Sequence, residues 1–427
     1  MMRSLSSAIA ALKNHQLYLD VIAANISNVN TTAYKSSKIS FQELLSQTIR
    51  PASAPQGGLG GRNSVQVGLG MALGSVSTDF TQGSPQATGK MTDLAIQGDG
   101  FFVVQGPLGN MYTRDGTVDI GLDGSLVSLA TGMHLLGWPA DATGAVNTTD
   151  GLGPIAIPFG QSMARATSEV RFKGNLAAEA EAGDTVTTQF GVYDSLGVIH
   201  TLEVVFTRNA GTPATWTLTA SELTVAADGS VVRTPVSSIS DNTIEFDEFG
   251  QIVDENAGSE GTESPTLQLE LAYDTGAVTP ALLTVNLATV TGLSGKSEVN
   301  PVSQDGLESG SLVSFSVDVY GQVVGVFSNG LNRTLGQLAL AKFINPGGLL
   351  RQGENLYSVS TNSGTPQHGE PGQDGRGLIS AGYLEASNVD LAQQFTNMIV
   401  AQRGFQANSR IISTSDEMLN ELVNLKR

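Results

Sequence analysis

The chain has 427 residues, more than one ordinary hydrophobic core supports, and therefore predicts two or three domains. Its net charge of −18 comes without a basic stripe that could neutralise phosphates, which disfavours nucleic-acid binding. The absence of cysteine excludes disulfides, thiol catalysis and cysteine-ligated metal sites.

The charge is concentrated in the middle of the chain. Residues 141–300 carry 21 acidic and 6 basic side chains, a net charge of −15. Residues 1–50 carry a net charge of +3 and residues 384–427 carry −1. The middle segment is therefore expected to be hydrated and self-repelling, and both ends are expected to pack more closely.

Residues 1–30 predict a long amphipathic helix. Its apolar side chains recur at alternating steps of three and four, as in a heptad stripe, with Gln16 as a polar break. Few charged side chains occupy the rest of its surface, so the helix is expected to be covered on more than one side. The large apolar residues of the stripe are Leu5, Ile9, Leu12, Leu19 and Ile26.

The beginning of the chain does not resemble a cleavable secretion signal. Polar residues at 13–16 interrupt any apolar run in the first 22 residues. No window of 18 apolar residues exists anywhere in the sequence, so membrane insertion is not predicted.

The first predicted helix runs into a polar segment, "AANISNVNTTAYK", at residues 23–35. Asn25, Asn28 and Asn30 lie within six residues of one another and are followed by two threonines. Such side chains can bond the freed backbone groups of a helix end, and asparagine tolerates the left-handed conformation there. We call this segment the seam and expect the chain to turn at it.

The centre of the chain predicts two nested β domains, preceded by a linker or extended arm at residues 31–75. Short alternating segments with turns about every ten residues are typical of β-barrels or sandwiches. The boundaries predicted are 76–142 with 298–384 for a discontinuous β domain, and 143–297 for an inserted, outer acidic β domain.

Residues 385–427 predict a second long helix, with Asp390 suited to its start. Apolar residues recur every seven positions at Leu391, Met398, Phe405, Ile412 and Leu419, with Phe395 beside them. The fold class predicted is therefore mainly β with α-helical termini. The two terminal helices either pair within the chain as a coiled coil or take part in assembly between chains.

No constellation of residues predicts catalysis, a metal or a cofactor. His15, His134, His200 and His368 are scattered, and none has a second histidine at a ligand spacing. The segment "EFDEFG" lacks the pattern of a calcium loop and predicts a solvated turn. We therefore expect a protein that is not an enzyme.

Three long segments resemble the flagellar axial proteins, the family of rod and hook subunits. These are "AANISNVNTTAYK", "DLAIQGDGFFVV" followed by "YTRDGTVDIGLDGSLV", and residues 382–427. Residues 190–208 and 335–357 also resemble the outer-domain and returning segments of hook members. One departure is Ala33, where many members of the family carry glycine, which predicts a tighter local turn.

The resemblance implies a structural subunit of the hook. Such a subunit polymerises into a flexible curved tube, a universal joint that transmits torque from motor to filament. It further implies export by the flagellar type III apparatus without a cleavable signal, and an extracellular location in the flagellum. The partners implied are other copies of the chain, the rod, the hook cap, the hook-length control protein and the hook–filament junction proteins.

We expect the apolar stripes of the two helices and the asparagines of the seam to form one assembly interface between copies of the chain. It consists of Leu5, Ile9, Leu12, Leu19, Asn25, Ile26, Asn28, Asn30, Leu391, Phe395, Met398, Phe405, Ile412 and Leu419.

Three alternatives remain open. The chain could be a distal rod subunit with a large insertion, or a secreted β-rich adhesin whose acidic domain binds a surface ligand. An adhesin would not need heptad helices at both ends. A glycoside-cleaving enzyme would need a pair of carboxylates in a cleft, which the sequence does not show.

Overall fold

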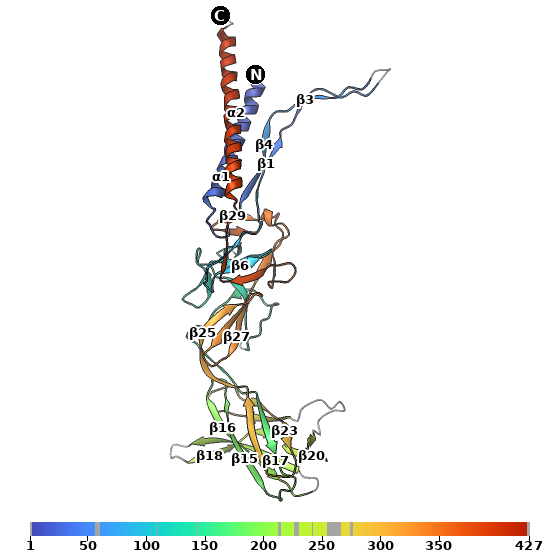
Figure 1. The fold of residues 1–427 in the computed structure, drawn as a ribbon, viewed down its shortest axis with the longest axis vertical. Helices are drawn as coiled ribbons and strands as arrows, with labels where there is room; N and C mark the ends of the chain where they lie inside the picture. The colour runs from blue at the N-terminus through green and yellow to red at the C-terminus, as the bar shows by residue number, and fades with distance from the viewer. Residues whose placement is uncertain are drawn as a thin grey trace. The chain divides into compact units, whose positions relative to one another are not determined.

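A computed structural model describes residues 2–55, 60–107, 109–141, 143–211, 215–225, 230–240, 242–253, 266–273 and 276–424 (Figure 1). The chain is mainly β with one helix near each end, which confirms the predicted fold class. It forms two compact units. The first consists of Met1–Ile157, Ser316–Val324 and Thr334–Arg427, and the second of Pro158–Phe315 and Gly325–Arg333.

The unit boundaries differ from those expected for an insertion at residues 143–297. Strand β24 (Glu298–Gln304) pairs with β14 (Glu169–Asn175), and both belong to the second unit. The second unit therefore extends to residue 315 and also includes residues 325–333. Strands β25 (Leu307–Val317), β26 (Gln322–Phe327) and β27 (Asn332–Leu338) contain residues of both units.

In the first unit, the two helices are α1 (Met2–Ser27) and α2 (Leu391–Asn424). After α1 the chain forms a two-stranded antiparallel ribbon in place of an unpaired linker, and we call it the arm (residues 37–55 and 60–78). In the arm, β1 (Ser37–Glu43) pairs with β4 (Met71–Thr78), and β2 (Gln47–Arg50) pairs with β3 (Val65–Val67).

The main sheet of the first unit has six antiparallel strands. Their order is β29 (Leu350–Gly353), β30 (Leu356–Ser358), β8 (Gly109–Thr113), β7 (Phe101–Gly106), β28 (Leu340–Lys342), β31 (Gln367–Gly369). Three two-stranded pairings also occur: β5 (Pro85–Ala87) with β33 (Tyr383–Glu385), β6 (Leu94–Gln97) with β32 (Leu378–Ala381), and β9 (Val118–Ile120) with β10 (Leu126–Ser128). Strand β11 (Leu136–Pro139) pairs with both β12 (Gly153–Pro154) and β27, within a second sheet of six strands. A short 3-10 helix, η1 (Pro346–Gly348), precedes β29.

The core of this unit is aromatic. The Phe101 and Tyr112 rings each contact the Phe343 ring edge-on, at centroid distances of 5.7 and 4.8 Å. Because β7 is buried on both of its faces from Phe101 to Val104, "FFVV" is a continuous apolar run rather than an alternating one.

The second unit is a β-sandwich. One sheet has the order β19 (Ser238–Ile239), β22 (Thr266–Leu271), β23 (Ala281–Thr291), β14, β24. The other has β15 (Thr185–Tyr193), β16 (Ile199–Arg208), β17 (Thr215–Val225), β20 (Thr243–Phe246), β21 (Ile252–Val253), with β18 (Val231–Pro235) beside β17. Strand β13 (Ser162–Arg165) pairs with β25. Residues of both sheets form one core, in which the Phe172 and Phe190 rings lie 5.2 Å apart.

One turn recurs in both units, and it follows from an Asp-x-x-Gly sequence. In the turn at Asp318, the carboxylate accepts hydrogen bonds from the amides of Tyr320 (2.9 Å) and Gln322 (2.8 Å). Gly321 has a φ of 73°, a conformation that a residue with a Cβ rarely adopts. The predicted solvated turn "EFDEFG" contains another example. The same bonding occurs at Asp141, Asp194 and Asp247.

Candidate functional site

Helices α1 and α2 lie side by side (Figure 1). Gly404 of α2 faces His15 of α1, and a Cβ at that position would lie 2.6 Å from the imidazole Cε1. Further along, the Asn25 amide is 3.4 Å from the side-chain oxygen of Gln394. A larger residue at position 404 would therefore require the His15 ring to move.

The buried stripe of α2 differs from the predicted one. Ala401 and Ser415 are buried, and Gln394 and Asn408 are half-buried, so the covered positions recur every seven residues. They lie three residues after the apolar heptad expected from the sequence. The expected pairing of the helices within the chain is present, but the most buried positions of α2 carry small side chains.

Large apolar residues of the predicted stripe are only partly covered. On α2, Leu391, Phe395 and Phe405 are exposed, to 40%, 51% and 38%. The other predicted positions are half-buried, except for Ile9 of α1, which is exposed. The half-buried ones are Leu5, Leu12, Leu19 and Ile26 of α1, and Met398, Ile412 and Leu419 of α2. The two helices together thus leave an apolar surface without a cover within the described part of the chain.

The base of the arm packs against α1. Asn14 is buried, and its amide donates a hydrogen bond to the carbonyl of Met71 in β4 (2.8 Å). The Phe41 ring of β1 stands edge-on to Tyr18, at a centroid distance of 5.8 Å. Helix α1 is therefore covered by α2 and by the arm, as its few charged residues predict.

The three asparagines of the seam have different surroundings. Asn25 is 1% exposed, and its amide bonds both backbone groups of Ser37 (2.9 Å each). Asn28 bonds the carbonyl of Ala24 (2.8 Å) and so caps the end of α1, while Asn30 is exposed. Because Asn25 is fully used within its own chain, we remove it from the expected assembly interface.

The left-handed residue of the seam is Ala33, with a φ of 56°, and none of the asparagines. The tolerance of asparagine for this conformation is not used here, and the physical reason lies in the surroundings of Ala33. Ala33 is 1% exposed, and its amide donates to the carbonyl of Glu385 (2.7 Å), so only a small side chain fits. The tertiary contact therefore fixes a conformation that local propensity would give to Asn or Gly.

We expect Ala33→Gly to change the free energy of unfolding of the first unit by no more than about 1 kcal/mol, since relief of left-handed strain and lost chain entropy oppose each other. Ala33→Val adds a branched side chain in a buried left-handed position and should cost about 2–4 kcal/mol. Chemical denaturation of both variants measures this difference. Equal stability of the glycine and valine variants would contradict the assigned conformation.

A buried ion cluster joins the seam to the segment before α2. The Lys35 ammonium lies 2.6 Å from the Glu385 carboxylate, and these side chains are 0% and 1% exposed. The same carboxylate oxygen accepts a hydrogen bond from the amide of Gly83 (2.8 Å), and the other oxygen lies 3.6 Å from Arg114. Burial lowers the pKa of Lys35 and of Arg114, while the charge of Glu385 acts in the opposite direction on each.

Further hydrogen bonds surround this cluster. Asn388 accepts from the amide of Ser36 (2.8 Å) and donates to the carbonyl of Asp79 (2.8 Å). Asn355 donates to the carbonyl of Thr32 (2.9 Å). The residues after α1 are thus fixed to segments that follow them by some 320 to 350 positions. We call this set of contacts the junction (residues 31–36, 79–83, 114, 355 and 385–388).

Two small cavities open beside the seam. One, of about 180 Å³, is lined by Asn28, Tyr34 and Arg351 among others. The other, of about 210 Å³, is lined by Asn30, Gln86 and neighbouring residues. The exposed polar side chains of the seam therefore border hollows that a second protein surface could fill.

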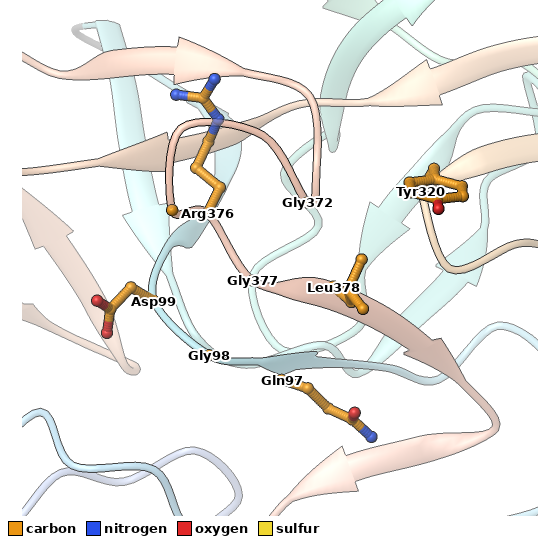
Figure 2. A pocket seen from close by; sticks show the side chains of 9 residues that line it. Gln97, Gly98, Asp99, Tyr320, Gly372, Arg376, Gly377 and Leu378 are labelled. Carbon is orange, nitrogen blue, oxygen red and sulfur yellow. The ribbon is translucent and has the colours of Figure 1, made fainter.

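A larger open cavity of about 460 Å³ lies between residues 97–99, Tyr320 and the loop 372–378. Figure 2 shows the side chains of Gln97, Asp99 and Arg376 pointing in different directions from it. The Arg376 guanidinium is already bonded to Asp374 (2.7 Å) and to the carbonyl of Glu370 (3.0 Å). The cavity therefore lacks the convergent polar groups that a catalytic site requires.

The histidines have separate surroundings. His134 bonds Ser125 (2.7 Å), His200 lies between Asp194 (3.3 Å) and Glu222 (2.6 Å), and His368 stacks on Tyr112. Among the described residues, no group of three or more His, Asp or Glu side chains is placed to hold a metal ion. In the same part of the chain, no helix has the length and apolar character needed to cross a membrane.

Sequence reasoning missed Gly404 and the ion cluster. A lone glycine inside a helical pattern signals a packing requirement, so Gly404 was detectable. Lys35 and Glu385 stand 350 residues apart, and no local pattern relates them.

Four family descriptions match the chain. "Flagella basal body rod protein" matches residues 5–35, and "Flagellar hook protein FlgE/F/G D1 domain" matches 95–175. "Flagellar basal body protein FlaE D2 domain" matches residues 164–307, and "Flagellar basal body rod FlgEFG protein C-terminal" matches 380–425. The matched segments include both helices and most of the second unit.

Three relatives align over essentially their whole length. The "Flagellar hook protein FlgE" of Treponema pallidum is 40% identical, and that of Borreliella burgdorferi is 38% identical, each alignment covering 100% of both chains. The "Flagellar basal-body rod protein FlgG" of Bacillus subtilis is 30% identical, again over 100% of both chains.

Proposed function

We propose that this chain, which belongs to the flagellar hook protein FlgE family, polymerises through its terminal helices into the wall of the hook. The chain is a structural subunit of the flagellar hook and not an enzyme, and it is part of the external flagellum. The observation that carries the mode of assembly is the apolar surface left open on the paired helices.

Several large apolar side chains of α2 are exposed. Phe395, Ile399 and Val400 are 51%, 52% and 60% exposed, and Ile411 and Met418 continue the exposure further along α2. Scattered apolar residues are normal on protein surfaces, but a run of them along one helix marks an interaction site. Copies of the same helices are the natural cover, since each brings an equivalent surface.

The burial pattern of α2 supports this proposal. Among its described residues, the two that are buried, Ala401 and Ser415, are small, and Gly404 faces His15 of α1, while Phe395 and Phe405 are exposed. Those side chains remain available for neighbouring subunits. The revised interface therefore keeps the predicted residues of both helices, together with Asn28 and Asn30, and omits Asn25.

The finer roles belong to the same proposal. The terminal helices would line the core of a flexible curved tube, and the acidic second unit would face the solvent. The tube would act as a universal joint that transmits torque to the filament. Export by the type III apparatus without a cleavable signal, and contacts with the rod, cap, length-control and junction proteins, rest on family membership alone.

A rod subunit is the second candidate, and one observation favours it: the match to the rod protein of Bacillus subtilis. The relatives with 38–40% identity are hook proteins, and the description of a D2 domain covers residues 164–307. The hook is therefore the better supported assignment.

The exposed part of the seam can be tested directly. The double variant Asn28→Leu, Asn30→Leu should be exported in normal amounts, but its hook yield should fall about tenfold, the equivalent of about 1.4 kcal/mol in total. Both residues border cavities at the surface, and the substitution removes their hydrogen-bonding groups. Export is measured in the culture medium, and hooks are counted by electron microscopy.

The capping role of Asn28 provides the control. Asn28→Ser keeps a short polar side chain at the end of α1, and together with native Asn30 it should assemble normally. A wild-type hook yield from the double leucine variant would limit the seam to a capping function.

A further inference from the structure

A histidine lies between two carboxylates in the second unit, beside the turn that connects β15 and β16. The Nδ1 atom of His200 lies 2.6 Å from the Glu222 carboxylate, and its Nε2 atom lies 3.3 Å from the Asp194 carboxylate. The imidazole is stacked on the Tyr273 ring, at a centroid distance of 4.2 Å. The side chains of His200 and Asp194 are 9% and 0% exposed. We call these four residues the histidine cluster.

The histidine cluster joins the two sheets of the sandwich. Its histidine and its two carboxylates belong to β16, to β17 and to the turn between β15 and β16, all in one sheet. Tyr273 follows β22, which belongs to the other sheet. Beyond Tyr273, the amide of Val278 donates a hydrogen bond to the hydroxyl of Ser195 (3.0 Å), which connects the same two segments a second time. The charge of the cluster therefore affects how the two sheets are held together here.

Asp194 also fixes the turn itself. One oxygen of its carboxylate accepts hydrogen bonds from the amides of Leu196 (2.9 Å) and Val198 (2.8 Å). A Cβ at Gly197 would lie 2.7 Å from the backbone nitrogen of Ser309 in β25, so the turn packs directly against that strand. A change in the bonding of Asp194 would therefore reach β25 as well as β16.

The two carboxylates need two donors, and only a protonated imidazole has two. A neutral imidazole carries one N–H group and can donate to one carboxylate, while its other nitrogen presents a lone pair to the second. An unpaired contact of this kind is costly in a buried site. An imidazolium donates from both nitrogens, carries the charge that the carboxylates attract, and stacks favourably on an aromatic ring.

The other charged groups on the neighbouring strands have partners or positions of their own. On β18, Arg233 is bonded to Glu203 (2.6 Å), and at the far end of β16 Arg208 is bonded to the carbonyl of the next residue (2.6 Å). On β22, Glu270 points away from the core, since the residues on both sides of it are buried. Burial and then the charges of the two carboxylates raise the pKa of Tyr273 to about 12, so its hydroxyl stays neutral.

We propose that His200 holds a proton in the folded second unit, and that loss of this proton at higher pH loosens the contact between the two sheets. Histidines of unfolded chains release their proton near pH 6.5. The stabilisation from the extra proton is therefore present in full at lower pH, and it is lost as the pH rises until the folded site also releases its proton. The inference concerns the second unit alone and does not depend on the proposed polymerisation.

Nuclear magnetic resonance of the full-length monomer, with nitrogen-15 in its histidine rings, tests the protonation state directly. The chain has four histidines, and His200→Gln identifies the signals of His200 by their loss. Substitution of the other three histidines identifies the same signals by elimination, should the first variant fail to fold. We expect both ring nitrogens of His200 to carry a proton at pH 7. A neutral His200 ring at pH 7 would overturn the proposal.

Hydrogen exchange at the amides of Leu196, Val198 and Val278, corrected for the intrinsic effect of pH, measures the consequence. In the wild-type chain the equilibrium constant for local opening should rise about tenfold between pH 6 and pH 8. Glu222→Gln should reduce this rise to about twofold or less, because its amide can donate to a neutral imidazole.

Glu298→Gln is the matched control, because it removes a carboxylate whose side chain is 57% exposed on β24. It should keep the wild-type dependence on pH. The same dependence in all three chains would overturn the proposed effect on the sheets.

Discussion

Replacing Glu385 by Gln is expected to lower the free energy of unfolding of the first unit by about 3–5 kcal/mol. The carboxylate is 1% exposed and faces two buried cations, Lys35 at 2.6 Å and Arg114 at 3.6 Å. Glutamine keeps an acceptor for the amide of Gly83 but removes the negative charge. Both cations would then remain buried without a counter-charge, which is the costly result of breaking a buried ion pair.

The order of two variants makes this prediction specific. Lys35→Met removes one cation and leaves Glu385 with Arg114, so we expect it to destabilise the unit less than Glu385→Gln. Asp119→Asn is the surface control, because it breaks an ion pair of 3.0 Å whose members are 43% and 46% exposed. That change should cost about 0.2–1 kcal/mol.

Denaturant unfolding, followed by hydrogen exchange at residues 31–36 and 385–388, measures these effects. Loss of protection should begin at the junction in the Glu385 variant. A Glu385→Gln chain as stable as the Asp119→Asn chain would show that the cluster does not hold the terminal helices to the sheet.

The second large effect is expected on assembly rather than folding. Phe395→Asp with Ile399→Asp places two carboxylates four residues apart on the exposed face of α2, where the native side chains are 51% and 52% exposed. Burial of these side chains in a polymer should contribute about 3 kcal/mol in total. The association constant should therefore fall at least about 100-fold, with little change in the thermal stability of the monomer.

A conservative replacement tests whether assembly needs an apolar surface in general or these two side chains in particular. Phe395→Leu with Ile399→Leu keeps the apolar area and should still form hooks, although fewer of them. The measurement is the yield of sedimentable polymer together with hooks counted on cells. Normal hooks from the double aspartate variant would mean that another surface drives assembly.

The two helices could be predicted from the sequence. Which face of each helix is buried could not be predicted. Apolar residues at steps of three and four gave both helices, and α1 ends at Ser27, close to the predicted seam. Periodicity favours large residues such as Leu391 and Phe405 for the buried stripe. In the structure Ala401 and Ser415 are buried instead, because small residues allow the closest approach of two helices. A sequence does not distinguish a face buried within the chain from one buried between chains.

The junction could not be predicted for a different reason. Its bonds connect residues 31–36 with residues that follow far along the chain, and each member resembles an ordinary surface residue when read alone. Lys35 contributes to the basic count of the first 50 residues, yet it is completely buried. Ala33 likewise takes its left-handed conformation from a contact with Glu385 rather than from its own propensity.

Turns were the most predictable local feature. The Asp-x-x-Gly sequences at Asp247 and Asp318 form the same bonded turn, since the aspartate satisfies the amides within four residues of itself. Domain boundaries were harder to predict from the sequence, because β24 belongs to the second unit through its pairing with β14. Strand partners far apart in sequence decide such boundaries.

Electron microscopy of basal bodies from a strain that lacks this gene shows directly whether the chain builds the hook. We expect complete rods that end at the cell surface without a curved hook, and full recovery when the wild-type gene is restored. Missing or truncated rods would assign the chain to the rod, and intact hooks with filaments would exclude it from both structures.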